Sequence, residues 1–148
     1  MTSFKFSPGL ATVRQARQCQ QELRDIVDVG MTLQQAHVSA DLAEELQFNE
    51  DFLKSHSLKA ASEELEKLIA SAPSFEIIVA VEPSDIFLQD LIVWFRINLN
   101  AQALVNYKVR RSIGGGMIVR TRNRMYDFSF RPKVVAGRQH LVEVLRRV

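Results

Sequence analysis

The chain has 148 residues, which is the length of one medium-sized domain or of two very small ones. Hydrophobic residues make up 47% of the chain and charged residues 24%, a globular composition that excludes a wholly disordered protein. The single cysteine, Cys19, excludes an intramolecular disulfide and favours a reducing compartment.

Charge is distributed unevenly along the chain. Residues 1–100 carry 8 basic and 15 acidic side chains, a balance of −7, whereas residues 101–148 carry 11 basic and 2 acidic side chains, a balance of +9. A basic third of this kind suits nucleic acid, an anionic membrane or an acidic protein surface. The longest apolar run, residues 91–95, is too short for a spanning helix, so we expect the protein to meet a membrane only through partners.

Residues 10–70 have the periodicity of amphipathic helices. We predict a first helix from Leu10 that ends at Gly30, a second helix capped by Thr32, a break at residues 49–52, and a third helix capped by Ser57. Such thin helices suit a small bundle or packing against a helix of another chain.

Two further predictions concern the faces of these N-terminal helices and of the helix that follows. The carboxylate run at Glu44 and Glu45 is expected on a solvated face of the second helix. A helix from about residue 84 to residue 99 is apolar almost all round, so we expect it to be buried or covered on two sides.

A change of period after Ser71 predicts a boundary between a helical region, residues 1–72, and an α/β domain, residues 73–148. Strands are predicted at 75–82, 103–111, 117–122 and 124–130, with Ile77, Val79 and Val81 on one face of the first. Asn123 is expected to form the hairpin turn in a left-handed conformation, and a last helix is expected at 137–148. The predicted fold is therefore α+β, with a short helical bundle before a β-α-β-β-β-α domain that has a small mixed sheet.

No pattern in the sequence predicts catalysis, a metal site or a cofactor. The three histidines, His37, His56 and His140, lie in separate elements without the spacing of a metal site. The triple glycine at 114–116 precedes a strand, whereas a phosphate-binding loop needs a following helix, so these glycines indicate a bulge or a close backbone approach. We expect a protein that is not an enzyme.

Arginine and aromatic residues alternate in the hairpin at 117–131. The residues in question are Arg120, Arg122, Arg124, Tyr126, Phe128, Phe130 and Arg131. Such a surface can stack single-stranded bases and hold phosphates, which makes a small RNA-binding or ribosome-associated module the alternative interpretation. The other interpretation is a strand with one aromatic face in the core and arginines that are solvated or bind protein.

The hairpin also resembles a known family. Residues 112–120 (SIGGGMIVR) and 125–131 (MYDFSFR) resemble the C-terminal signature of the F-type ATP synthase delta subunit, the family that includes the mitochondrial oligomycin-sensitivity-conferring protein. The residues on the family pattern are Ser112, Gly115, Gly116, Arg120, Asp127, Ser129 and Arg131. The chain departs from the pattern at Gly114, an aliphatic position in the family, at Phe128, which replaces the glycine of Asp-Gly-Ser, and in its shorter helical region.

The resemblance implies a non-catalytic subunit of the peripheral stalk, or stator, of a proton-translocating ATP synthase. Such a subunit links the catalytic alpha/beta head to the membrane-anchored b-type stalk, peripherally on the cytoplasmic or matrix side of the energy-coupling membrane. Asp127 and Ser129 would bond local backbone near the glycine turn. The expected partner-binding residues are Arg122, Arg124, Phe128, Phe130, Arg131, Leu141 and Leu145. The E-like stator subunit of a vacuolar-type enzyme is a third hypothesis.

Overall fold

The computed structural model describes residues 3–146; for Arg131, Val134 and residues 139–141 it describes the backbone alone. Four helices are followed by the order β-α-β-β-β-α, and this confirms the predicted α+β class with its helical N-terminal part and small mixed sheet. The chain divides into two compact units, residues 1–74 with 85–105 and residues 75–84 with 106–148. This division differs from the predicted one, because the helix after the first strand groups with the N-terminal helices.

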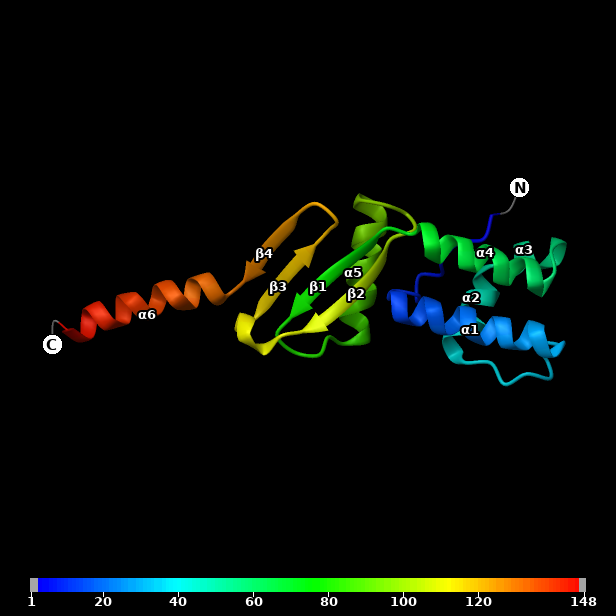
Figure 1. The fold of residues 1–148 in the computed structure, drawn as a ribbon, viewed down its shortest axis with the longest axis horizontal. Helices are drawn as coiled ribbons and strands as arrows, with labels where there is room; N and C mark the ends of the chain where they lie inside the picture. Colours follow the sequence, from blue (N-terminus) through cyan, green and yellow to red (C-terminus); the bar gives the residue numbers. More distant parts are fainter. Residues whose placement is uncertain (1–2, 147–148) are drawn as a thin grey trace. The chain divides into compact units, whose positions relative to one another are not determined.

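The N-terminal unit is built on four helices, α1 (Val13–Val29), α2 (Ala40–Phe48), α3 (Glu50–Ser55) and α4 (Leu58–Ser71) (Figure 1). A capping box starts α1: the Thr12 hydroxyl accepts a hydrogen bond from the backbone N–H of Gln15, whose side chain accepts one from Thr12 N–H. Gly30 ends α1 in the left-handed conformation and Ser57 caps α4, and both observations agree with the prediction.

The second helix begins later than predicted. The carbonyl of Thr32 accepts hydrogen bonds from Gln35 and Ala36, and the Gln35 side chain accepts one from Thr32 N–H. These bonds close a single turn instead of starting a helix. α2 begins after Ser39, whose hydroxyl accepts the N–H of Leu42 at 3.3 Å. The predicted break at residues 49–52 is the single residue Asn49, which separates α2 from α3.

The segment before α1 is not helical, yet it supplies a large part of the core. Phe4, Phe6 and Leu10 are buried, and the ring of Phe4 meets the ring of Phe52 edge-on at a centroid distance of 5.5 Å. The remaining buried members of this core are Ala16, Cys19, Leu23, Ile26, Leu42, Leu46, Ala61, Leu65 and Leu104. The segment from Phe4 to Leu10 is therefore part of the folded unit.

Glu45 lies inside this unit and is 0% exposed, which corrects the prediction of a solvated face, although Glu44 is exposed as expected. Its Oε2 accepts the backbone N–H of Ser7 at 2.9 Å. Asn49, one turn further along, accepts the N–H of Lys5 and donates to the Lys5 carbonyl, both at 2.9 Å. The N-terminal segment needs these partners because its backbone is buried against α2 without the hydrogen bonds of a helix or sheet.

Helix α5 (Asp85–Asn98) is covered on one side only. Leu88, Ile92 and Phe95 are buried, but Trp94 is 55% exposed and Ile97 is 77% exposed, so the prediction that this helix is buried or covered on two sides is wrong. At its C-terminal end the Arg96 guanidinium donates to the backbone carbonyls of Ser7 (2.7 Å), Leu10 (2.5 Å) and Ala103 (3.2 Å). Arg96 therefore satisfies three carbonyls of segments that have no regular secondary structure.

Four strands form one sheet in the order β2-β1-β3-β4 (Figure 1). Their bounds are β1 (Ser74–Val79), β2 (Leu104–Val109), β3 (Gly116–Arg120) and β4 (Met125–Ser129). β1 pairs antiparallel with β3, with Glu76 opposite Arg120, and β3 pairs antiparallel with β4. β4 is consequently an edge strand.

Strand β1 has buried side chains on both faces. Ile77, Ile78 and Val79 are all buried, whereas Val81 lies beyond the end of the strand and is exposed. The predicted alternation of Ile77, Val79 and Val81 is therefore wrong for Val81. The second half of this inner strand is a continuous apolar run because neither of its faces meets solvent there.

Helix α6 (Arg131–Arg146) follows β4 directly and starts earlier than the predicted Gly137. Pro132 lies in its first turn, where a helix needs no N–H donor, so the proline ends the strand without delaying the helix. The side chains of α6 that the structure describes are all exposed. Among residues 3–146, no helix combines the length and the apolar character that crossing a bilayer requires.

Candidate partner-binding surface

The glycine turn connects β2 to the hairpin through the short 3-10 turn η1 (Arg111–Ile113). Gly114, Gly115 and Gly116 have φ values of 74°, 128° and 73°, a region that other residues rarely adopt. A Cβ atom on Gly116 would overlap the carbonyl oxygen of Phe128, and one on Gly115 would lie 2.8 Å from the ring of Phe130. The predicted close backbone approach is confirmed, and β3 follows the glycines where a phosphate-binding loop would need a helix.

The two halves of the motif meet across the hairpin. Gly116 lies opposite Ser129 in the β3–β4 register, and the N–H of Phe130 donates to the Gly115 carbonyl at 3.0 Å. Asp127 accepts the backbone N–H of Ser129 at 2.8 Å, so it bonds local backbone as predicted. Ser129 is buried, but its hydroxyl has no hydrogen-bond partner in the described structure, so the predicted bond from this side chain is wrong.

Two other motif residues have simpler surroundings. The guanidinium of Arg120 lies 3.9 Å from the Glu76 carboxylate on β1, and Lys108 on β2 contacts the same carboxylate. This pair of contacts links three strands, although exposed ion pairs of this kind contribute little stability. Ser112 is exposed within η1, next to the buried Ile113.

Thr121 closes the tip of the hairpin. Its N–H donates to the Arg124 carbonyl at 2.8 Å, and its hydroxyl accepts the Arg124 N–H at 3.1 Å. No described residue other than glycine has a positive φ, so the predicted left-handed Asn123 is wrong. The turn is held by the Thr121 side chain as well as by backbone, because the Thr121 hydroxyl accepts the Arg124 N–H. Arg122 and Arg124 are both exposed at this tip.

The aromatic side chains of β4 face solvent. Phe128 is 61% exposed, and its ring stacks nearly parallel (9°) to that of Tyr126 with 6.4 Å between centroids. Phe130 is also exposed on one side while it covers Gly115 on the other. The interpretation that places these rings in the core is therefore wrong. An edge strand with exposed aromatic rings and flanking arginines has the composition of a binding surface.

Helix α6 follows β4 directly in the chain and carries further exposed apolar and basic side chains. Of the predicted partner-binding residues it carries, Leu145 is 64% exposed, whereas the side chains of Arg131 and Leu141 lie outside the described ones. Lys133, Arg138 and Arg146 are exposed basic residues of the same helix. Together, the exposed side chains of β4, of the hairpin tip and of α6 are called the basic surface.

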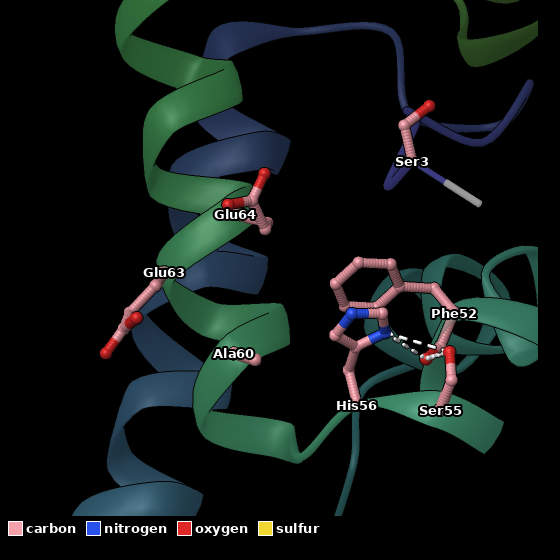
Figure 2. Close-up of a pocket in the computed structure, with 7 residues that line it drawn as sticks. All are labelled: Ser3, Phe52, Ser55, His56, Ala60, Glu63 and Glu64. Carbon is pink, nitrogen blue, oxygen red and sulfur yellow. Dashed lines mark hydrogen bonds between the residues drawn. The ribbon is translucent and has the colours of Figure 1, made fainter. Parts of the chain in front are cut away.

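A shallow hollow of about 470 Å³ lies in the N-terminal unit between α3 and α4 (Figure 2). The His56 ring stacks on Phe52 with a centroid distance of 4.1 Å, and its Nδ1 lies 2.9 Å from the Ser55 hydroxyl and 3.1 Å from the Phe52 carbonyl. These contacts satisfy the histidine at the end of α3, so the adjacent serine and histidine have a structural role. Glu63 and Glu64 line the opposite wall, with Glu64 paired to Lys67.

Among the side chains that the structure describes, no three of the metal-binding types gather to form a site. The Cys19 thiol is buried in the core, and burial raises its pKa to about 12, which is the opposite of what a reactive cysteine needs. The chemistry that this arrangement offers is recognition by apolar contact and positive charge.

Tyr126 was named from the sequence in the alternating arginine–aromatic set but was not among the predicted partner-binding residues, and the structure places it in the exposed aromatic pair. One feature was not found from the sequence. The outward apolar face of α5 was visible as excess hydrophobicity, but the pattern could not distinguish a covered face from an exposed one. Comparison with known proteins found no matching family model and no similar curated protein.

Proposed function

We propose that this chain is a delta-type subunit of the peripheral stalk of a rotary, proton-translocating ATP synthase. The observation that carries the proposal is that the residues of the resemblance form one local structure. Gly115 and Gly116 lie against Phe128, Ser129 and Phe130 across the hairpin, although they are separated in sequence.

The main departure from the family pattern has a local explanation. The side chain of Phe128 points away from the glycine turn and is largely exposed, while its carbonyl makes the close approach to Gly116. A side chain at this position is therefore compatible with the turn, provided that Gly116 remains glycine. In this chain the glycine turn is therefore formed with an exposed aromatic ring at position 128.

On this proposal the protein performs no chemistry and transmits torque between two partners. The basic surface would dock on an acidic helical segment of the b-type stalk subunit. Phe128 and Leu145 would supply apolar anchors, and Arg122 with Arg124 would set orientation and the rate of association. The acidic N-terminal unit would face the alpha/beta head.

Co-purification from the native organism tests the proposal. The tagged full chain is recovered from mildly solubilised membranes after nuclease treatment, and bound proteins are identified by mass spectrometry. We expect alpha, beta and b-type subunits. Arg122→Glu with Arg124→Glu should reduce their recovery about tenfold without unfolding the chain, because both side chains are exposed. Arg17→Glu with Arg24→Glu, on the exposed face of α1 and outside the basic surface, is the matched control for the charge change, and it should leave recovery of the b-type subunit unchanged.

A small RNA-binding module is the second candidate, and the exposed stacked rings of Tyr126 and Phe128 favour it. Arg124 lies beside them, with its guanidinium 3.5 Å from the Tyr126 hydroxyl. Rings and cations in this arrangement suit single-stranded bases and phosphates. Recovery of ribosomal proteins or RNA fragments without ATP synthase subunits would support this candidate and overturn the first.

A further inference from the structure

Residues 3–7, called the N-terminal arm, have the burial pattern of a bound extended peptide. Phe4 and Phe6 are 3% and 5% exposed, whereas Ser3 and Lys5 face solvent. Successive side chains of an extended segment point to opposite sides, so the two rings enter the unit together and the residues beside them stay outside. The Phe4 ring meets Phe52 of α3 edge-on, as described above.

The backbone of the N-terminal arm is hydrogen-bonded to polar side chains from the rest of the unit. Asn49 accepts the Lys5 N–H and donates to the Lys5 carbonyl, so one carboxamide binds both polar groups of this residue. The side chain of Gln102, which follows α5, accepts the Phe6 N–H at 3.4 Å. In the recognition of extended peptides, such main-chain bonds supply affinity and pockets for alternate side chains supply specificity.

Two of the polar side chains that hold the arm are themselves deeply buried. Glu45 is 0% exposed and Asn49 is 5% exposed. Glu45 and Arg96 bind the N–H and the carbonyl of Ser7, and the Arg96 guanidinium also lies 5.8 Å from the centre of the Phe6 ring. Buried polar groups need hydrogen-bond partners, so this groove is matched to a peptide backbone at this place.

An exposed turn links the arm to the rest of the chain. Pro8 and Gly9 form this turn, which the Leu10 N–H closes by donating to the Ser7 carbonyl at 3.2 Å. Proline and glycine are typical turn residues. The covalent link raises the effective concentration of the arm at its groove, but the contacts that recognise the arm come from its own backbone and rings.

We propose that the groove formed by α2, α3, α5 and the residues after α5 is a binding site for an extended peptide, and that the N-terminal arm is its ligand in cis. The ligand class is a segment with phenylalanine at two alternate positions and a serine directly after the second. Ser7 is 1% exposed, so a larger side chain at its position would not fit without displacing buried groups. A segment of another protein with this pattern would bind by displacing the arm. The groove is independent of the stator role, because its residues belong to the N-terminal unit and the basic surface lies elsewhere in the chain.

Cutting the folded full chain at the exposed turn tests the proposal. A protease site inserted between Pro8 and Gly9 allows the link to be cut after folding. We expect the severed arm to remain bound in gel filtration, and a fluorescein-labelled peptide of residues 3–8 (SFKFSP) to replace it with a saturable rise in anisotropy. The uncut chain should bind this peptide at least about tenfold more weakly, because its groove is already filled in cis.

Matched changes in the peptide and in the groove define the site. An unlabelled peptide with Phe4→Ala and Phe6→Ala should not compete, whereas one with Lys5→Ala should compete as well as the parent peptide, because that side chain faces solvent. In the cut chain, Asn49→Leu should weaken peptide binding at least about tenfold, because it removes both bonds to the Lys5 backbone. Asn106→Leu, at an exposed asparagine of β2, is its control.

Three results would overturn the proposal. In the first, the severed arm leaves the chain, and the remainder stays helical by circular dichroism but binds no peptide. In the second, the cut chain loses its helical signal and saturating peptide does not restore it. In the third, the peptide without phenylalanines competes as well as the parent. The peptide variants leave the protein unchanged, so they test the site independently of the stability of Asn49→Leu.

Discussion

The N-terminal segment is held to the second helix by two side chains, Glu45 and Asn49, and to the fifth helix by Arg96. Glu45 accepts the N–H of Ser7, and Arg96 donates to the Ser7 carbonyl. Both backbone polar groups of Ser7 are therefore hydrogen-bonded to ionisable side chains. The two charged groups are not in direct contact, and burial raises the pKa of Glu45 against the smaller opposing effects of Ser7 and Arg96. The folded chain therefore holds the Glu45 proton more tightly than the unfolded chain does.

This raised pKa makes stability depend on pH with a definite sign. The folded chain keeps the Glu45 proton to a higher pH than the unfolded chain, so the free energy of unfolding falls as the pH rises from about 4.5 through the folded pKa. Glu45→Gln keeps an acceptor oxygen for Ser7 and has no proton to lose. We expect its stability relative to wild type to increase between pH 4 and pH 7, as measured by urea denaturation.

The matched control is Glu44→Gln, the same change on the exposed neighbour. An advantage of Glu45→Gln that stays constant or shrinks as the pH rises would contradict the assignment. Glu45→Ala differs from both, because it leaves the Ser7 N–H buried without an acceptor, which costs about 1–3 kcal/mol at any pH.

At the scale of elements, the hairpin depends on the conformation of its glycine turn. Gly116→Ala places a Cβ against the Phe128 carbonyl at φ 73°, so we expect the free energy of unfolding to fall by at least about 2 kcal/mol. Gly114→Ala is the control, because its φ is nearly the same but the space beside it is open, and it should cost about 1 kcal/mol. Hydrogen exchange should show the added opening of Gly116→Ala in β3 and β4.

Elements whose ends are set by local signals were predictable, and those set by distant contacts were not. Gly30 and Ser57 mark their helix ends through their own backbone or side chain. Thr32 and Ser39 are equally suitable caps, and the choice between them follows from the turn that Gln35 closes. Glu45 is buried because of Ser7, a residue far away in the sequence, so no periodicity of the second helix could indicate it.

The candidate site also divides into features set by local sequence and features set by distant contacts. The glycine motif and the basic hairpin could be predicted from the sequence because each depends on residue types at fixed spacing. The sequence could not show whether Phe128 faces the core or solvent. Aromatic residues at every second position predict that they share one face of a strand, but not which face is buried. The exposure of one apolar face of α5 could not be predicted for a related reason, because its apolar residues continue around the helix into the buried face of Leu88 and Ile92.

For the whole molecule, the separation of charge along the chain is the feature that any partner will meet. The exposed basic residues with described side chains at the hairpin tip and in α6 are Arg122, Arg124, Lys133, Arg138 and Arg146. They lie beside exposed apolar groups, so the two candidate functions differ in how much of the binding energy comes from charge. Salt concentration separates the two contributions, because it screens charge and leaves apolar contact nearly unchanged.

Salt titration of the purified chain against the b-type subunit and against oligouridine therefore distinguishes the two functions. For RNA, each neutralised phosphate contributes a log–log slope of about 0.7, so five such contacts would give a slope of about 3 to 4. Docking on a stalk helix through Phe128 and Leu145 should give a much shallower slope, because apolar burial supplies most of the affinity. Binding of oligouridine with the steep slope, without binding of the b-type subunit, would reverse the order of the two proposals. In that case the basic residues hold phosphates and the exposed rings of Tyr126 and Phe128 stack on bases.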